Sequence, residues 1–217
     1  MLVGHLAVGF VAKRIEPEVS LGTFVFAALL ADFVGFVLLI LGIERFEPVT
    51  GAEINRAIGH HLYYSHSLLM LVVWGGLFAA AWFFHRHYPR GTWLIFGAVI
   101  SHWVLDTISH RADMPLVPGV PIFLGLKLWN SLPATLLVEG GFWLVAIVVY
   151  VRATRARNWA ARVLFWIVIL LITLVWIGNI RAGLDPNLAK AGISGLIFFG
   201  LVVAWAYWMN RVRPTRD

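Results

Sequence analysis

The chain has 217 residues, of which 60% are apolar and 13% are charged, and its formal net charge is +6 at pH 7. Soluble domains are about 45–50% apolar and about 25% charged, so the composition excludes a soluble globular domain, a disordered chain and a fibrous repeat. The absence of cysteine excludes disulfides, thiolate metal sites and cysteine nucleophiles. We expect the positive charge to mark the cytoplasmic loops of a membrane protein rather than a nucleic-acid partner.

The apolar residues fall into blocks of about 20, the length at which a helix crosses a bilayer. A first apolar segment, residues 1–12, would rise only about 18 Å as a helix, which is less than the ~30 Å hydrocarbon core. Its basic pair follows the apolar run instead of preceding it as in a signal peptide. We interpret this segment as a short, half-membrane helix that packs inside the bundle.

Six strong spans follow this segment along the chain. They cover residues 20–42, 65–84, 92–110, 132–151, 163–180 and 191–209. The expected fold is therefore all-α, a polytopic transmembrane helical bundle of six spans plus the short N-terminal helix. We expect one integral membrane domain over residues 1–217.

Lysine and arginine are unevenly divided between the two faces that these spans would create. Basic residues collect in cytoplasmic loops, so we expect the larger set to be cytoplasmic in a bacterial inner membrane, with the C-terminus on the same side. The two longest loops, residues 43–64 and 111–131, would then face outward and are candidates for function. The larger set has eleven members, Lys13, Arg14, Arg86, Arg90, Arg152, Arg155, Arg157, Arg162, Arg211, Arg213 and Arg216, and the smaller has six, Arg45, Arg56, Arg111, Lys127, Arg181 and Lys190.

Ionisable groups are costly in a membrane core and usually mark function. Asp32 lies in the middle of the first strong span, where a lone carboxyl must be protonated, paired or bound to a cation. His66 is expected in the first turn of the second span, with Ser65 as its N-cap. His61 lies five residues before it, beside His60. The first two spans are therefore candidates for a buried polar site.

The third span carries the sharpest signal, the run SHWVLDTISHRAD. His102, Asp106 and His110 follow one another at steps of four residues, so all three project from one face of a helix. If the helix continued to residue 113, Asp113 would lie on the same face of it as His102. A histidine and an aspartate four residues apart can reach one ion, and imidazole with carboxylate suits zinc, manganese or iron.

The rise per residue of a helix places His5, in the N-terminal segment, and Asp32, in the first span, at similar depths in the membrane. His5 would lie about 13 Å beyond the basic pair, and Asp32 about 18 Å beyond the start of its span. Six groups could then share one buried pocket, which is too many for one tetrahedral zinc but suitable for two ions. The predicted ligands are His5, Asp32, His61, His66, His102 and Asp106.

Three neighbouring groups have supporting roles in this prediction. His60 could replace His61 as a ligand, and His110 and Asp113 could orient the ligands by hydrogen bonds. A structural alternative exists for each intramembrane histidine or aspartate, because such a group can also serve as a hydrogen-bond partner between helices.

Taken in chain order, these residues resemble the membrane-bound metal-dependent hydrolases of bacteria and archaea. That family has a Thr-His near its start, a Pro-Asp-x-Asp element, a His-Arg-x-x-Thr-His-Ser motif and a His-x-x-x-Asp pair. The matching elements here are Gly4 with His5, Ala31 with Asp32, the run HLYYSHS at residues 61–67, and His102 with Asp106. The resemblance covers about the first 110 residues, and residues 111–217 would add further spans.

Three positions depart from the family pattern. Val34 stands where the family has its second acid, Leu62 where it has the arginine of the loop motif, and Ser65 where it has threonine. The resemblance implies a metal centre, and the missing acid leaves one ion or two as alternatives. A second ion would need one more ligand from among His60, His110 and Glu139.

The combined pattern favours a membrane-embedded metal-dependent hydrolase. One or two divalent ions, with zinc favoured over manganese, would lower the pKa of a bound water and polarise a phosphoryl or acyl oxygen. Asp106 could be a ligand, could orient His102 or could act as the base. Because the pocket would open toward the outer leaflet, we expect membrane lipid as the partner and a lipid-like molecule or phosphoester as the substrate.

Glu139 is the second candidate catalytic group. It lies near the outer end of the fourth span, where it could act as a general base or pair with Arg111 or Lys127.

Two functions other than hydrolysis stay open at this point. Buried carboxylates and imidazoles also serve a divalent-cation or proton transporter, and a non-catalytic scaffold could use the same groups only to fix helix packing.

Overall fold

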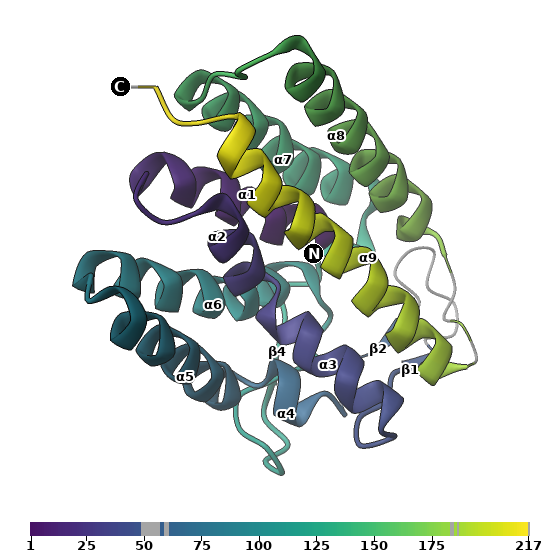
Figure 1. Cartoon of the computed structure of the whole chain (residues 1–217). Coiled ribbons are helices and arrows are strands. Elements are labelled where there is room, and N and C mark those ends of the chain that lie inside the picture. Colours follow the sequence, from purple (N-terminus) through teal and green to yellow (C-terminus); the bar gives the residue numbers. More distant parts are fainter. Residues whose placement is uncertain (49–56, 59–60, 183–184, 186, 217) are drawn as a thin grey trace.

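The computed structural model describes residues 1–48, 57–58, 61–182, 185 and 187–216 (Figure 1). These residues form an all-α bundle with two short β-hairpins, which confirms the predicted fold class. The helices are α1 (Leu2–Ile15), α2 (Leu21–Ala28), α3 (Leu30–Ile40), α4 (Tyr63–His66), α5 (Leu68–Arg86), α6 (Pro89–Ser109), α7 (Leu132–Ala153), α8 (Trp159–Ile180) and α9 (Leu188–Val212), with a 3₁₀ turn, η1, at Leu128–Asn130.

Five helices, α5 to α9, are each long and apolar enough to cross a membrane. Helices α2 and α3 are long and apolar enough only when taken together, and they meet at a bend of 53°, which is the geometry of a broken span or of a re-entrant loop. Five of the six predicted spans are therefore single helices, and the first, residues 20–42, is bent instead of straight. Leu29 stands at the break, with φ −102° and ψ 3°, and neither proline nor glycine marks it in the sequence.

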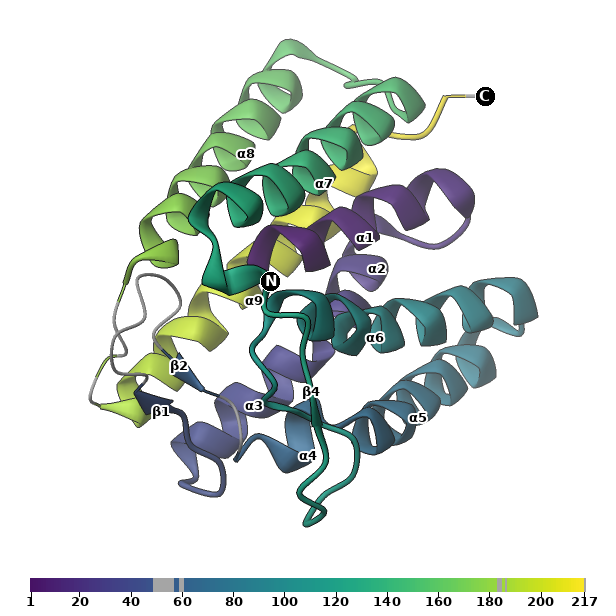
Figure 2. The same ribbon diagram turned by 180° about the vertical axis from the view of Figure 1, so that it is seen from behind.

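The short helix α1 lies at the centre of the bundle, as predicted. Figure 2 shows it between α7 and α6, and it also packs against α2. Its 14 residues rise about 21 Å, and most of them are buried, including Val3, Leu6 and Phe10. The buried position explains why a helix this short carries an ionisable side chain, because its neighbours replace the lipid that would otherwise surround it.

The second predicted span begins differently from our expectation. The turn α4 ends at His66, Ser67 adopts an extended conformation with ψ 147°, and the spanning helix α5 starts at Leu68. The Ser67 side chain accepts a hydrogen bond from the Met70 N–H at 3.3 Å and is the N-cap. The prediction that Ser65 caps this helix was wrong, and His66 lies outside the spanning helix.

The two long connections lie together at one end of the bundle (Figure 2). One carries the antiparallel strands β1 (Glu47–Pro48) and β2 (Ala57–Ile58), with Glu47 opposite Ile58. The other carries β3 (Met114–Pro115) and β4 (Phe123–Leu124), with Met114 opposite Leu124. The α5–α6 turn, the α7–α8 connection and the C-terminus lie at the other end (Figure 1), so most of the larger basic set gathers there.

Candidate metal centre

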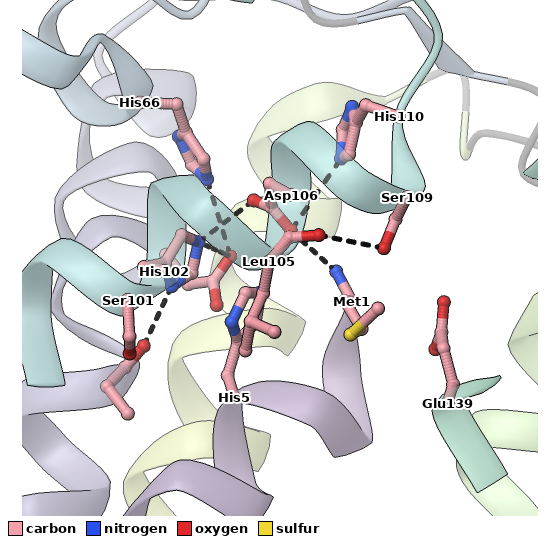
Figure 3. A network of polar contacts seen from close by, with 12 residues as sticks. Met1, His5, His66, Ser101, His102, Leu105, Asp106, Ser109, His110 and Glu139 are labelled. Atoms are coloured by element: carbon pink, nitrogen blue, oxygen red, sulfur yellow. Dashed lines mark hydrogen bonds and ion pairs between the residues drawn. The ribbon is translucent and has the colours of Figure 1, made fainter. Parts of the chain in front are cut away.

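Five of the six predicted ligands meet inside the bundle. They are His5 from α1, Asp32 from α3, His66 from α4, and His102 and Asp106 from α6, and we call them the His/Asp cluster. Their ligand atoms form two groups, His5–Asp32–His102 and His66–His102–Asp106, within each of which the atoms lie within 4.8 Å of one another. Figure 3 shows the imidazoles and the Asp106 carboxylate pointing toward one another.

The distances within the cluster are those of a compact polar site. The Nε2 atom of His102 lies 3.2 Å from Asp106 Oδ2 and 3.9 Å from Asp32 Oδ1. His5 Nε2 is 3.0 Å from Asp106 Oδ1, and His66 Nε2 is 3.6 Å from Asp32 Oδ1. All the side chains are buried except that of Asp32, which is 20% exposed. The cluster is thus nearly closed to solvent, with its opening at Asp32.

His102 is the member that both groups share. Its Nδ1 donates a hydrogen bond to the carbonyl oxygen of Ala28 at 2.7 Å, so in the neutral ring the lone pair lies on Nε2, which faces the two aspartates. This Nε2 has no hydrogen-bond partner within the part of the chain that the structure describes. The Ala28 carbonyl stands at the end of α2, so the bend of the first span supplies the acceptor that orients this ring.

His66 is oriented by a relay that the sequence did not suggest. The Ser65 hydroxyl donates to Glu44 Oε2 at 2.5 Å, so it accepts a hydrogen bond from His66 Nδ1, 2.6 Å away. The other carboxylate oxygen of Glu44 accepts the backbone N–H groups of Tyr64 and Ser65 at 2.7 and 3.0 Å. The relay leaves the Nε2 lone pair of His66 directed at Asp32.

Glu44 is therefore a functional candidate that sequence reasoning missed. It lies just beyond the first span, where it looks like any charged loop residue, yet it is only 2% exposed. A second unforeseen feature is Gly35, one turn beyond Asp32 on α3. A Cβ there would lie 3.2 Å from His66 Cε1 and 3.3 Å from Ser65 Oγ, so the glycine allows α3 and α4 to approach closely.

Asp32 occupies a different local position from the one expected. It stands in the first turn of α3 rather than in the middle of a continuous helix. The unpaired N–H groups and the positive end of the macrodipole at a helix N-terminus stabilise a carboxylate. The break at Leu29 thus creates a favourable setting for the charge of Asp32 as well as a carbonyl for His102.

Asp106 has contacts on both oxygens. The α-amino group of Met1 donates to Oδ1 at 2.8 Å, a contact that the sequence did not suggest, and His110 Nε2 lies 3.9 Å from the same oxygen. His110 Nδ1 is 3.1 Å from Asp113 Oδ1. The two predicted supporting residues are therefore beside the cluster, with His110 as the C-cap of α6 and Asp113 beyond the end of that helix.

Two predicted residues do not join the cluster. His61 Nε2 lies 2.8 Å from Glu47 Oε1 and 3.3 Å from Arg45 Nη2, and its side chain is 34% exposed in the outer connection. The structure does not bring His61 into the His/Asp cluster as predicted, because its side chain lies against Glu47 and Arg45 in the outer connection. His60 lies outside the residues that the structure describes.

Glu139 lies near the cluster but belongs to neither ligand group. It is buried on α7, and Figure 3 shows its carboxylate on the side of Met1, away from His102. Its two oxygens accept indole N–H groups, from Trp129 at 2.7 Å and from Trp176 at 2.9 Å. These two indoles were not expected as partners, since the sequence had suggested a cation from the outer loop.

Comparison with known proteins gives one match. The model of the YdjM inner membrane protein family matches residues 1–182, which include every member of the His/Asp cluster. No curated protein and no solved structure matches the chain. The match supports the predicted location in a bacterial inner membrane and names no activity. The chain, whose apolar helices cross the membrane several times, thus belongs to the YdjM inner membrane protein family.

Proposed function

We propose that this protein is a membrane-embedded metal-dependent hydrolase with its centre at the His/Asp cluster. The observation that carries the proposal is the buried Nε2 of His102. Its tautomer is fixed by Ala28, it lacks a hydrogen-bond partner among the described residues, and carboxylate oxygens of Asp106 and Asp32 lie 3.2 and 3.9 Å away. Leaving a buried polar atom unpaired is costly, and a cation would remove that cost.

The cluster favours one divalent ion rather than two. Both ligand groups require His102, and its Nδ1 is already bonded to the Ala28 carbonyl. A single nitrogen lone pair binds one ion. The two groups therefore contain alternative ligands of the same ion and are not two separate sites. Imidazole nitrogen and carboxylate oxygen ligands suit zinc, with manganese as the alternative.

A bound divalent cation would act as a Lewis acid on a substrate oxygen and favour ionisation of a water molecule. The chain supplies the rest of the chemistry. The Ala28 carbonyl and the Ser65–Glu44 relay hold the rings of His102 and His66 in their ligand tautomers. Asp106 contacts both His5 and His102 and lies beside His110, so it can orient these ligands and pass a proton toward the His110–Asp113 pair.

Glu139 is assigned a positioning role within this proposal. Its two oxygens accept the indole hydrogens of Trp129 and Trp176, which holds the carboxylate on the side of Met1, away from His102 (Figure 3). Through Trp129, whose ring centroid lies 4.1 Å from that of His110, it can hold His110 beside Asp106. The base predicted from the sequence is therefore better sought in Asp106.

A lipid-like substrate is supported by an apolar groove beside the cluster. A cavity of about 390 Å³ lies between α1, α6 and α7, and Gly4, Val11, Gly97, Leu105 and Val145 are among its apolar lining residues. Gly4 precedes His5 and Leu105 precedes Asp106, so one end of the groove adjoins the cluster. From Gly4 to Ile15 it follows about 16 Å of α1, enough for much of an acyl chain with its ester group at the cluster.

Metal content tests the proposal directly. Protein purified without chelator should contain close to one zinc or manganese per chain by elemental analysis, and His102→Ala should lose it. His87→Ala, on the exposed turn between α5 and α6, is the matched control and should keep the metal. Protein without stoichiometric metal, or a His102→Ala variant with unchanged metal, would overturn the proposal. Retained metal with no turnover of lipid phosphoesters or lipid esters would remove the hydrolase assignment.

The broken first span favours one second candidate, a divalent-cation or proton transporter. Discontinuous helices near the middle of the membrane are typical of transporter binding sites, and Asp32 stands at such a break. Cation flux into proteoliposomes that disappears in Asp32→Asn, in a protein without hydrolytic activity, would favour this function over hydrolysis.

A further inference from the structure

The C-terminal tail is built into the fold at the end of the bundle opposite the hairpins. Thr215 pairs with Thr154 in an antiparallel bridge. Arg155 N–H donates to the Pro214 carbonyl at 2.9 Å, and Arg216 N–H donates to the Ala153 carbonyl at 2.8 Å. The tail after α9 therefore runs as a strand beside the α7–α8 connection, and we call this pairing the C-terminal clasp.

The side chain of Arg213 connects the clasp to the helices of the bundle. Its Nε donates to Thr154 Oγ1 at 2.7 Å, and its guanidinium lies 4.8 Å from the centre of the Phe165 ring. Arg213 and Thr154 are both buried. The α7–α8 connection is thus held in one conformation by side chains and by backbone bonds, and the arginines around it are presented at fixed positions.

Two polar cavities flank the clasp, and arginines line both. One, of about 390 Å³, is lined by Arg14, Arg152 and Arg216. The other, of about 810 Å³, is lined by Arg155, Arg157, Arg162 and Arg216, with Asn158 and Trp159 at the start of α8. Arg216 and Thr215 line both, so the two cavities adjoin at the clasp, and we call them together the basic groove.

The described residues that line this groove carry positive charge alone. No acidic side chain lines either cavity among the described residues. Burial lowers the pKa of Arg213, and the like charges of Arg216 and Arg162 lower it further, as expected where cations gather without counter-charges. A topology signal requires only basic residues in a loop, whereas this arrangement also orders them around a cavity.

We propose that the basic groove binds the phosphate group of an anionic membrane lipid. Guanidinium groups form paired hydrogen bonds with phosphate oxygens, and basic pockets between transmembrane helices bind anionic headgroups. A lipid is favoured over a soluble phosphate because Trp159, which is 75% exposed, stands at the rim, where an indole marks the membrane–water interface. This site is separate from the His/Asp cluster and does not depend on the proposed hydrolase activity.

Lipid binding to the purified full chain tests the groove. Wild-type protein in detergent is titrated with phosphatidylglycerol, with phosphatidylcholine and with inorganic phosphate, and bound species are counted by native mass spectrometry. We expect phosphatidylglycerol to bind in preference to phosphatidylcholine. The double variant Arg157→Gln with Arg162→Gln should bind it about thirty-fold more weakly, since each arginine near a phosphate contributes a factor of about five.

The matched control is Arg86→Gln with Arg211→Gln, which removes the same charge from two exposed arginines that line neither cavity. This control should bind phosphatidylglycerol as the wild type does. Equal loss in the two double variants, or equal binding of the two lipids by the wild type, would overturn the proposal. Binding of inorganic phosphate without phosphatidylglycerol would replace the lipid by a soluble anion and also overturn it. Melting temperatures of both variants verify that each is folded.

Discussion

At the scale of single residues, the centre depends on atoms that hold the ligands as much as on the ligands themselves. His102 and His66 each have one ring nitrogen directed at the aspartates because the other nitrogen is bonded elsewhere, to the Ala28 carbonyl and to Ser65. Glu44 stands behind Ser65 and accepts three hydrogen bonds. Partners of this kind fix the tautomer and raise the basicity of a metal-binding histidine.

Glu44 gives the first prediction. Glu44→Gln replaces an obligate acceptor by a group that can also donate, so Ser65 is no longer compelled to accept from His66. We expect metal affinity to fall about 10–100-fold, measured by competition with a chelator of known affinity. Glu47→Gln, an acid in the same connection that contacts His61, is the control and should leave the affinity unchanged. An equal fall in the control would contradict the relay.

At the scale of helices, the centre requires that α1 lie deep among its neighbours. Gly9 makes this approach to α2 feasible, because a Cβ there would lie 3.1 Å from the backbone N and Cα of Val25 and 2.8 Å from its Cγ2. Backbone atoms cannot rotate away, so an added methyl must push the two helices apart.

The second prediction follows from this contact. Gly9→Ala should destabilise the protein by about 1–3 kcal/mol and lower its melting temperature in detergent. Gly76→Ala is the control, since nothing lies within 4 Å of the added methyl, and the higher helix propensity of alanine should leave it unchanged or stabilise it by up to about 1 kcal/mol. If Gly9→Ala melts at or above the wild-type temperature, the close packing of α1 on α2 is wrong.

The third prediction concerns the groove formed by α1, α6 and α7. Gly97 lines it, and nothing lies within 4 Å of a Cβ at this position, so Gly97→Leu should fill the groove without disturbing the fold. If an acyl chain occupies the groove, turnover of long-chain substrates should fall by about tenfold or more, with metal content and short-chain turnover kept. Gly141→Leu, equally open but outside the groove, should behave as the wild type. Equal effects on long and short chains would exclude an acyl-chain site.

At the scale of the whole molecule, the two ends of the bundle differ in charge and in form. The hairpins lie at one end of the bundle, and the C-terminal tail and the α7–α8 connection, which form the C-terminal clasp, lie at the other (Figures 1 and 2). The positive-inside rule predicts that the clasp is cytoplasmic. This would leave the hairpins on the outer side of the membrane.

The fourth prediction tests this orientation, and the absence of native cysteine makes it straightforward. A cysteine at Ile122 or Leu126, which are 50% and 73% exposed, should react with a membrane-impermeant thiol reagent in intact spheroplasts. A cysteine at Arg86 or Arg157 should react only after the membrane is opened. The reverse labelling pattern would contradict this orientation. It would place the hairpins on the cytoplasmic side and the basic groove on the outer side of the membrane.

The sequence by itself determined that the chain lies in a membrane, where most of its spanning helices run and which residues are most of the members of the His/Asp cluster. Blocks of about 20 apolar residues require helices that cross a bilayer, and the step of four residues from His102 to Asp106 puts both on one helix face. The cost of burying ionisable groups identified His5 and Asp32 as well. These features depend on the local periodicity and the composition of the chain, and both can be read directly from a single sequence.

Only the tertiary structure decided which groups hold the ligands in place. Leu29 breaks a helix that no proline or glycine marks, and the break supplies the Ala28 carbonyl and a helix N-terminus for Asp32. Glu44 enters the site, whereas His61 turns away to Glu47. Such outcomes depend on which elements meet across long stretches of chain, and a hydrogen bond between distant residues leaves no periodic signal in one sequence.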